Sequence, residues 1–319
     1  MRVLVTGAAG YIGGRMVHKL CEADRVEQVV GTDIRQPETP HPKMIFAQQD
    51  IRNPLAPLIK QHNIDTIVHT AYVLPPIHNK SLMEDINKGG TRNVLKAASE
   101  TGVRQILYTS STTAYGFYPD NDTPLTEESP LRGNDDFIYA KNKKEIEGIF
   151  QAFTRDNPEV AVSIVRPCFV VGPGFKNPLA CHLQKKIVMI PSNTLPWQFV
   201  HEDDLVEIMA LLLFEKIGGI FNVAGDGTLT FKEMIQMLGN IPVPIPWKVV
   251  YPLNNLAWYL RLSFVTEIPS PSMRMMVNPW IATSEKLKQE TQYQFRFDSR
   301  SAFADYARYV KTGGNGQKA

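Results

Sequence analysis

The sequence predicts an α/β protein built on a doubly wound parallel sheet, followed by a smaller mixed C-terminal lobe. Over the first half of the chain, apolar segments of strand length alternate with amphipathic segments of helix length. A glycine cluster joins the first strand to the first helix, and closely spaced prolines break the pattern from Pro167 onward. Alternating strands and helices are typical of a parallel sheet covered on both faces, and short proline-broken pieces are typical of a lobe folded over a site.

The first strand and helix flank a glycine-rich turn within residues 3–14. Gly7, Gly10 and Gly13 follow an apolar run directly, and Asp33 ends a second apolar stretch twenty residues after Gly13. Glycine allows a sharp turn, close approach of a pyrophosphate, and tight packing of helix on strand. The free N–H groups of the helix then face the phosphates. This context predicts a dinucleotide-binding site.

The remaining elements follow from apolar periodicity. We expect strands at residues 28–33, 44–47, 66–69, 105–110 and 161–165. We expect helices at residues 11–23, 53–59, 86–101 and 137–155, and we expect Gly102 to end the third of these. A further helix is expected to run to Phe214, with Asp203 and Asp204 capping its start.

These elements predict a domain organisation. The dinucleotide-binding domain covers residues 1–172, and residues 197–225 return to it. The substrate lobe covers residues 173–196 and 226–311, and residues 312–319 form a disordered tail because they have almost nothing to bury.

Composition limits the function classes. The 319 residues are 43% apolar and 21% charged, which suffices for a large core, and the net charge is +2. No basic block alternates with aromatic residues, so nucleic acid is not an expected partner. The three cysteines form neither a disulfide framework nor a metal site. The opening residues predict a buried strand rather than a signal, and no apolar run spans a bilayer, so we expect a cytoplasmic protein without a membrane partner.

Candidate catalytic residues lie between positions 108 and 143. Tyr139 and Lys143 are four residues apart on a predicted helix, which places both side chains on one face. A nearby ammonium group favours the phenolate, since it lowers the phenol pKa from about 10 towards neutrality and makes tyrosine a usable base. Ser111 ends the preceding strand, where sheets of this type bind ligands, and its hydroxyl can hydrogen-bond the same substrate oxygen.

Together these residues resemble the extended short-chain dehydrogenases/reductases, which include sugar-nucleotide epimerases and dehydratases. The likeness covers residues 1–225 and, more loosely, continues to residue 311. Its motifs are Thr6-Gly7-x-x-Gly10-x-x-Gly13, Asp50-Ile51, His69-Thr70-Ala71, Asn87 with Gly90-Thr91-x-Asn93, Ser110-Ser111, Tyr139-x-x-x-Lys143, Arg166-Pro167 and Val200-His201-x-Asp203-Asp204.

The resemblance implies a Rossmann-type domain with a substrate lobe, catalysis by Ser111, Tyr139 and Lys143, and a homodimer formed through a helix bundle. It implies NAD as cofactor. Asp33 favours NAD because its charge repels a 2′-phosphate, although Arg35 leaves NADP open. The expected cofactor-binding residues are Gly7, Gly10, Tyr11, Ile12, Gly13, Asp33, Asp50, Ile51, Thr70, Ala71, Tyr72, Asn87, Tyr139, Lys143 and Pro167.

Two departures from the family pattern bear on substrate. Phe169, Trp197 and residues 278–280 stand where the nucleotide-sugar members have the Asn and Arg residues that bind the diphosphate, and aromatic side chains cannot replace bidentate arginine. Thr112 and Thr113 stand where the dehydratases have an Asp-Glu pair, which disfavours dehydration. The expected substrate-binding residues are Thr112, Thr113, Phe169 and Trp197.

The sequence therefore predicts an NAD-dependent enzyme acting on a secondary alcohol or ketone of a small molecule. One interpretation is an epimerase resembling the UDP-sugar 4-epimerases. The alternative is a simple dehydrogenase or reductase of a less charged substrate, resembling the hydroxysteroid or dihydroflavonol enzymes. A dinucleotide-sensing regulatory protein would predict a broken Ser/Tyr/Lys set, and here that set is intact.

Overall fold

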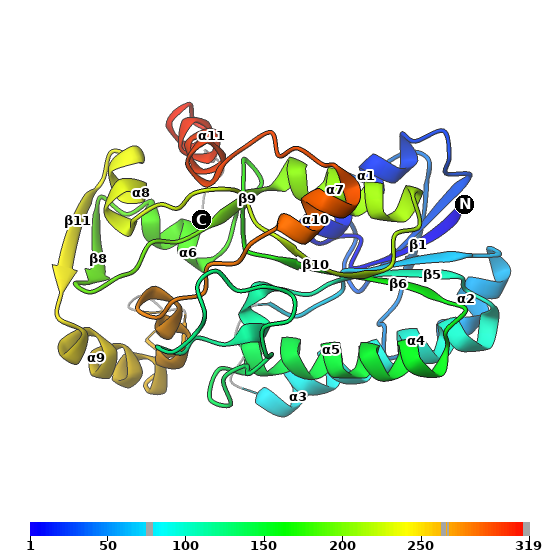
Figure 1. Cartoon of the computed structure of the whole chain (residues 1–319), viewed down its shortest axis with the longest axis horizontal. Helices are drawn as coiled ribbons and strands as arrows, with labels where there is room; N and C mark the ends of the chain where they lie inside the picture. The colour runs from blue at the N-terminus through cyan, green and yellow to red at the C-terminus, as the bar shows by residue number, and fades with distance from the viewer. Residues whose placement is uncertain (75–78, 263–265, 267, 315–319) are drawn as a thin grey trace. The chain divides into compact units, whose positions relative to one another are not determined.

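The computed structural model describes residues 1–74, 79–262, 266 and 268–314 (Figure 1). The chain divides into two compact units. The first contains Met1–Ala114, Lys141–Arg166 and Val206–Phe221, and the second contains Tyr115–Ala140, Pro167–Leu205 and the chain from Asn222 onward. Residues 115–140 belong to the second unit, whereas the domain boundaries expected from sequence put them in the first domain. Those domain boundaries stay a prediction.

The first unit is built on a seven-stranded sheet. Strand order is β10-β6-β5-β4-β1-β2-β3, and the pairs from β3 to β6 are parallel. The order reverses between β1 and β4, and in such sheets this switch point is where ligands bind. The strands are β1 (Arg2–Thr6), β2 (Gln28–Asp33), β3 (Met44–Gln48), β4 (Thr66–His69), β5 (Gln105–Thr109), β6 (Ala161–Pro167) and β10 (Gly219–Val223).

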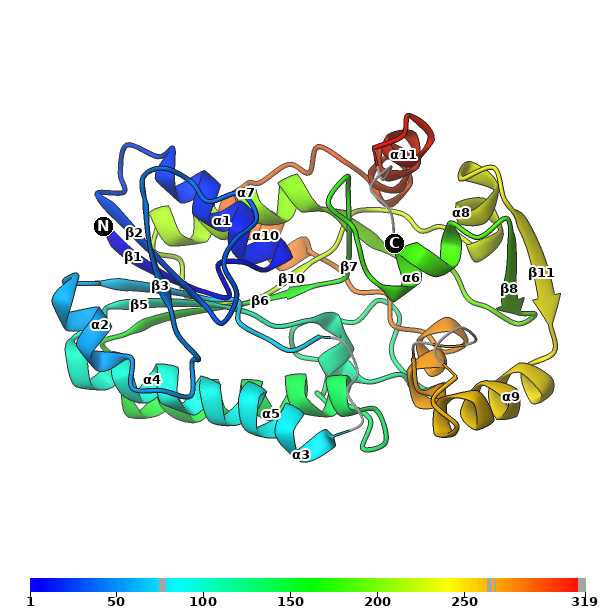
Figure 2. The same ribbon diagram turned by 180° about the vertical axis from the view of Figure 1, so that it is seen from behind.

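Helices cover both faces of this sheet. Figures 1 and 2 show α4 and α5 on one face and α1 and α7 on the other. Apolar side chains from α4 and α5, such as Val94, Ile146 and Phe150, pack on Leu4 and Ile106 of the strands. The helices are α1 (Tyr11–Cys21), α2 (Ala56–Gln61), α3 (Lys80–Glu84), α4 (Gly90–Thr101), α5 (Ile138–Asp156) and α7 (Glu202–Phe214). The predicted doubly wound α/β fold is confirmed.

The predicted helix at 86–101 is interrupted in the structure. A π-helical turn, η1 (Asp85–Gly89), separates α3 from α4, and π turns inside helices occur frequently at functional sites. Gly102 ends α4 with a positive φ of 73°, as predicted, because glycine adopts this conformation without steric cost.

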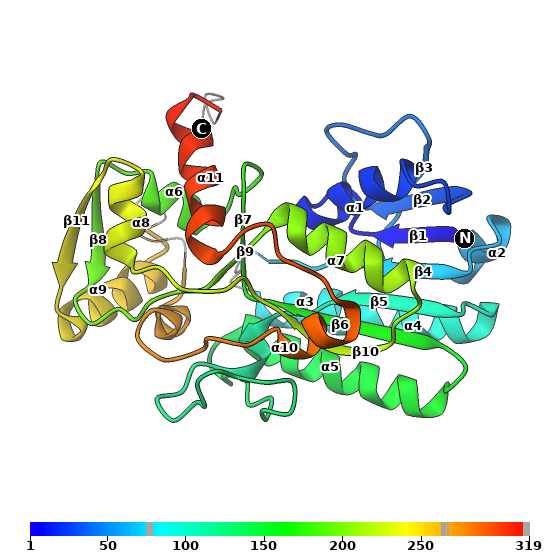
Figure 3. The same ribbon diagram turned by 45° about the horizontal axis from the view of Figure 1, so that its top comes forward.

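The second unit contains two small parallel sheets, which Figure 3 shows with their surrounding helices. β7 (Phe169–Val171) pairs with β9 (Phe199–His201), and β8 (Ile187–Pro191) pairs with β11 (Ile241–Ile245). Aromatic side chains dominate its core. The helical elements are η2 (Thr112–Tyr115), which begins in the first unit, and α6 (Pro178–Leu183), α8 (Phe231–Met237), α9 (Trp247–Tyr259), η3 (Ser270–Met276), α10 (Glu285–Thr291) and α11 (Ser299–Lys311).

The expected capping role of Asp204 is wrong. α7 begins at Glu202, so Asp204 lies within the first helical turn. Its fully buried carboxylate accepts hydrogen bonds from the Tyr293 hydroxyl and from the backbone N–H groups of Arg296 and Phe297. Asp204 therefore fixes the segment that leads into α11 instead of capping α7.

Two observations concern the chain end and membrane segments. α11 ends at Lys311, and residues 315–319 of the expected tail lie outside the described residues. Among the residues described, no helix combines the length and the apolar character that crossing a membrane requires.

Candidate active site

Lys143 is buried at the end of β5. Its ammonium group donates hydrogen bonds to the carbonyl oxygen of Thr109, at 2.8 Å, and to the hydroxyl of Tyr108, at 3.3 Å. It also lies 4.1 Å from the ring centroid of Tyr72, which follows β4. Burial lowers the pKa of Lys143 to about 7, and the opposing charge of Glu147 limits the shift. A lysine with a lowered pKa therefore lies at the carboxyl edge of the sheet.

Tyr139 lies one helical turn before Lys143. Both belong to α5, whose regular geometry puts side chains four residues apart on the same face. Tyr139 is partly buried, and its ring lies 6.0 Å from that of Phe137, centroid to centroid. The two residues therefore lie on one face of α5, and that the phenol meets the ammonium group stays a prediction from the Tyr-x-x-x-Lys spacing.

Ser111 follows β5 and is buried. Its hydroxyl oxygen accepts a hydrogen bond of 3.2 Å from the backbone N–H of Thr113, which fixes the turn into η2. Thr112 and Thr113 are also buried. Ser111 and Lys143 therefore both lie where β5 ends, and α5 supplies Tyr139.

A buried carboxylate beneath this set was missed at the level of sequence. Glu147, four residues after Lys143 on α5, has no exposed surface. Its oxygens accept hydrogen bonds from the Arg166 guanidinium, at 2.6 and 3.0 Å, and from the Ser110 hydroxyl, at 2.5 Å. The i, i+4 spacing from Lys143 was the available signal. The carboxylate keeps negative charge on the lysine face of α5 and supports the protonated form of Lys143.

The glycine loop fits a dinucleotide pyrophosphate. Gly7 has a φ of 75°, and a Cβ at this position would lie 2.7 Å from the backbone nitrogen of Ala71. A Cβ on Gly13 would overlap the carbonyl oxygen of Gly7. Any side chain at either position would therefore displace backbone, and the loop leads directly into the N-terminus of α1, the helix end that attracts phosphate groups.

Asp33 is tied to this loop. One of its carboxylate oxygens accepts a 3.1 Å hydrogen bond from the Ala9 N–H, and the other accepts one of 3.1 Å from the Arg35 N–H. The Arg35 guanidinium lies 4.0 Å from the same carboxylate and is largely exposed. The structure thus places an acid at the end of β2, beside the glycine loop, where an adenosine ribose would lie.

The other predicted cofactor residues lie at or after strand ends, at the start of α1, or in the π turn. Asn87, in the π turn, accepts a 2.8 Å hydrogen bond from the Val73 N–H, and so fixes the chain that follows β4. The Arg52 guanidinium hydrogen-bonds the Asp50 carboxylate and holds its pKa below the usual range. Thr70, Ala71 and Tyr72 follow β4, Tyr11 and Ile12 begin α1, Ile51 follows Asp50, and Pro167 ends β6.

His69 is a packed strand-end residue. The Thr91 hydroxyl donates its hydrogen to the Asn87 carbonyl oxygen, so it accepts from His69 Nε2, and His69 Nδ1 accepts from the Thr6 hydroxyl. Burial lowers the His69 pKa to about 3. The neutral ring therefore takes no part in acid–base chemistry.

The predicted substrate residues differ in exposure. Trp197 is 2% exposed and packs on Phe169, with ring centroids 5.1 Å apart, inside the aromatic core of the second unit. Its indole N–H donates to the Met275 carbonyl oxygen. Phe169 is only partly buried. Trp197 therefore supports Phe169 from behind, and Phe169 is the more accessible of the pair.

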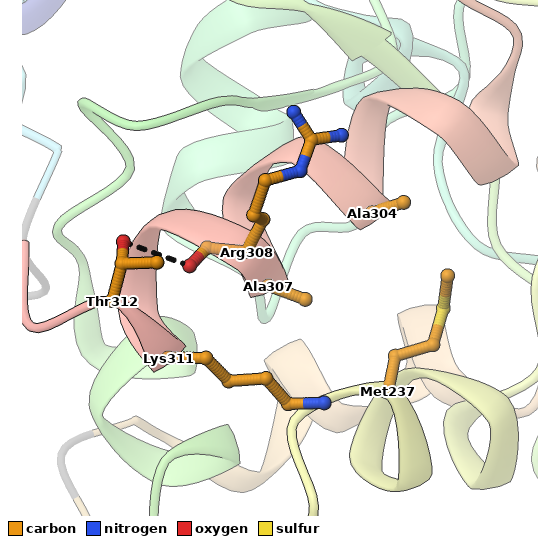
Figure 4. A pocket seen from close by; sticks show the side chains of 6 residues that line it. All are labelled: Met237, Ala304, Ala307, Arg308, Lys311 and Thr312. Carbon is orange, nitrogen blue, oxygen red and sulfur yellow. Dashed lines mark hydrogen bonds between the residues drawn. The ribbon is translucent and has the colours of Figure 1, made fainter.

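A surface pocket in the second unit contains none of these residues. It has a volume of about 400 Å³ and lies between α8 and α11, with Arg308 and Lys311 on its rim (Figure 4). The Thr312 hydroxyl is hydrogen-bonded to the Arg308 carbonyl oxygen instead of facing a ligand. Nothing in this pocket provides a catalytic group.

The chain is similar in sequence to known proteins. An uncharacterized protein of Mycobacterium tuberculosis is 28% identical over 315 residues, covering 96% of this chain and 83% of that protein. UDP-glucose 4-epimerase 2 of Oryza sativa subsp. japonica is 30% identical over 222 residues, covering 61% of this chain and 50% of its own length.

Solved structures share the fold over nearly the whole chain. UDP-glucose 4-epimerase of Thermotoga maritima has a TM-score of 0.78 at 18% identity, covering 98% of this chain and 99% of its own. The dTDP-glucose 4,6-dehydratase of Bacillus anthracis, in complex with NAD, has a TM-score of 0.77 at 17% identity, covering 98% and 97%. The model of the NAD dependent epimerase/dehydratase family matches residues 3–224, so this chain belongs to that family and its cofactor is NAD.

Proposed function

We propose that this protein transfers a hydride between NAD and the carbinol carbon of a secondary alcohol, with Tyr139 as the base. The observation that carries the proposal is the buried ammonium group of Lys143, held where β5 ends, one helical turn from Tyr139. The test is the steady-state turnover of Tyr139→Phe.

Each catalytic side chain has a distinct task. The Tyr139 phenolate takes the proton of the substrate hydroxyl, and bound NAD would supply the acceptor for the hydride that leaves the carbon. The Ser111 hydroxyl donates a hydrogen bond to the same oxygen as it becomes a carbonyl. The Lys143 ammonium stabilises the phenolate electrostatically and hydrogen-bonds the nicotinamide ribose. In the reverse direction, Tyr139 returns the proton to the oxygen.

The favoured reaction is epimerisation or simple oxidation and reduction. In an epimerase the ketone turns over and receives the hydride on its other face, whereas in a dehydrogenase the reduced cofactor leaves. Family membership supports both, and the likeness to UDP-sugar 4-epimerases supports the first. Dehydration is disfavoured because Thr112 and Thr113 offer no carboxyl group to expel water.

The proposal includes the binding residues and the setting of the protein. The glycine loop binds the pyrophosphate, Asp33 binds the adenosine ribose, and Phe169 faces the substrate. We further propose a cytoplasmic homodimer that takes a small-molecule substrate.

Cofactor preference is the first testable consequence. NAD binds more tightly than NADP to the wild-type protein, because the Asp33 carboxylate accepts ribose hydroxyls and repels a 2′-phosphate. Calorimetric titration of both cofactors measures this. Asp33→Asn weakens NAD binding and reduces the difference in affinity between NAD and NADP. The matched variant Arg35→Gln keeps the preference for NAD. Tighter binding of NADP to the wild type would show that Arg35 outweighs Asp33.

Substrate charge is the second consequence. UDP binds weakly, because a diphosphate enclosed without arginine lacks charge-assisted hydrogen bonds worth about 1.5 to 3 kcal/mol each. Two such losses weaken binding by ~10²-fold or more. Arg274 is already paired with Asp136 at 2.9 Å, which leaves exposed Arg261 as the alternative.

Calorimetry with UDP decides between the substrate classes. We expect dissociation constants well above micromolar and slow or absent turnover of UDP-sugars. Micromolar affinity that disappears in Arg261→Ala or Arg274→Ala would instead establish a nucleotide-sugar epimerase.

A further inference from the structure

Helix α9 presents an apolar face to solvent. Val249, Leu253, Leu256 and Leu260 recur at the spacing of one helical face, and all four are exposed, Leu253 by 61%. Ala257, at the border of this face, is buried, and the helix packs against β8 and η3. An ordinary surface helix shows the reverse pattern, with its apolar stripe turned inward.

The neighbouring sheet repeats this pattern. Ile187 and Met189 of β8 are exposed, as are Ile241 and Val243 of β11, and the register pairs them as direct neighbours on one sheet face. Figures 1 and 3 show β8, β11 and α9 at the same end of the second unit, and Pro246 alone links β11 to α9.

We term the exposed apolar side chains of these neighbouring elements, together with Tyr259 at the end of α9, the apolar patch. Of the fifteen large hydrophobic side chains found exposed among the described residues, nine belong to it. Such concentration on one surface marks a site of interaction. The members are Ile187, Met189, Ile241, Val243, Val249, Leu253, Leu256, Tyr259 and Leu260.

The charges around the patch are of one sign. Lys185 and Lys186 precede β8, Lys248 lies in the first turn of α9, and Arg261 follows its end; all four are exposed. The sequence contains no Asp or Glu at residues 178–201 or 240–266. Two copies of this chain meeting through the patch would bring these cations together without acidic partners, whereas an anionic surface complements them.

The length and exposed residues of α9 suit a lipid surface. Tyr259 of this 13-residue helix is 80% exposed, whereas Trp247, Tyr251 and Trp258 are partly buried on its inward side. Indole and phenol rings prefer the boundary between lipid headgroups and acyl chains, and a helix lying in that boundary combines an apolar face with flanking basic residues. Spanning a bilayer takes about 20 residues, so α9 would lie in the surface and not cross it.

We propose that the apolar patch docks this protein on the surface of an anionic lipid bilayer, with α9 lying in the plane of the interface. The exposed leucines enter the acyl boundary, and the flanking lysine and arginine side chains pair with lipid phosphates. This inference does not depend on the reaction proposed above, and it departs from the expectation from sequence that the protein has no membrane partner.

Vesicle flotation with the full-length protein tests the proposal. The wild type is expected to float with vesicles of phosphatidylcholine and phosphatidylglycerol, and to release as salt concentration rises. Vesicles of phosphatidylcholine alone are expected to bind much less of the protein. Each of Lys248→Ala and Arg261→Ala lowers the partition coefficient about fivefold, the value for about 1 kcal/mol per basic residue at an anionic surface.

Matched variants separate the patch from general stickiness. Leu253→Asp combined with Leu256→Asp is expected to lower the partition coefficient at least tenfold, because both side chains leave the acyl boundary. Ile34→Asp replaces an equally exposed apolar residue, 59% against 61%, in the first unit and is expected to leave flotation unchanged.

Three results would overturn the proposal. The first is wild-type protein that stays unbound to anionic vesicles at low salt. The second is equal flotation of the double variant and the wild type. The third is a dimer in sedimentation velocity that Leu256→Asp dissociates, since the patch would then be an interface between copies of this chain.

Discussion

Replacing Tyr139 by phenylalanine lowers kcat by at least ~10² and leaves NAD affinity nearly unchanged. The substitution removes only the hydroxyl that exchanges the substrate proton and leaves Lys143, with its hydrogen bonds to Thr109 and Tyr108, in place. Steady-state turnover and calorimetric titration of NAD measure the two quantities on the same preparations.

Lys143→Ala is the informative comparison for this variant. It lowers both kcat and NAD affinity, because Lys143 stabilises the phenolate and hydrogen-bonds the nicotinamide ribose. Turnover near the wild-type value in Tyr139→Phe would remove Tyr139 from the mechanism, whatever the effect of Lys143→Ala.

Arg166→Met destabilises the folded protein by about 3–5 kcal/mol, the usual cost of breaking a buried ion pair. Glu147 has no exposed surface, so its carboxylate would lose the guanidinium that neutralises it without gaining water. Urea unfolding followed by circular dichroism measures the change in free energy of unfolding.

Two variants test the cause of that loss. Arg25→Met removes an exposed ion pair of similar length, 2.9 Å from Glu215, and changes stability by less than about 1 kcal/mol. The double variant Arg166→Met with Glu147→Leu recovers much of the stability, because the Glu147 carboxylate no longer stays buried without its guanidinium. Wild-type stability in Arg166→Met alone would contradict the buried-pair argument.

Regular elements of the first unit follow from sequence because their signals are local. The predicted strands at 28–33 and 66–69 coincide with β2 and β4, since runs of Val, Ile and Thr between polar residues favour buried strands. The interruption at η1 was missed because apolar periodicity reveals which face is buried, not which carbonyl each N–H pairs with.

Contacts between residues that are remote in the sequence could not be predicted from it. Tyr139 and Lys143 are predictable neighbours because one helix carries both. Glu147 and Arg166 lie on α5 and β6, nineteen positions apart, and an acid on an amphipathic helix is ordinarily solvated. Asp204 was misassigned for the same reason, because its partners at 293–297 are remote in sequence.

The most direct test of hydride transfer is isotope tracing. A secondary alcohol that the protein turns over is labelled with deuterium on its carbinol carbon and incubated with the NAD-loaded protein. Product, nicotinamide and water are then analysed by mass spectrometry. We predict that the deuterium is found on the nicotinamide ring or returned to the same carbon of the product, and never in water. Deuterium released to water during turnover would show that the carbon loses a proton instead of a hydride, and would contradict the account.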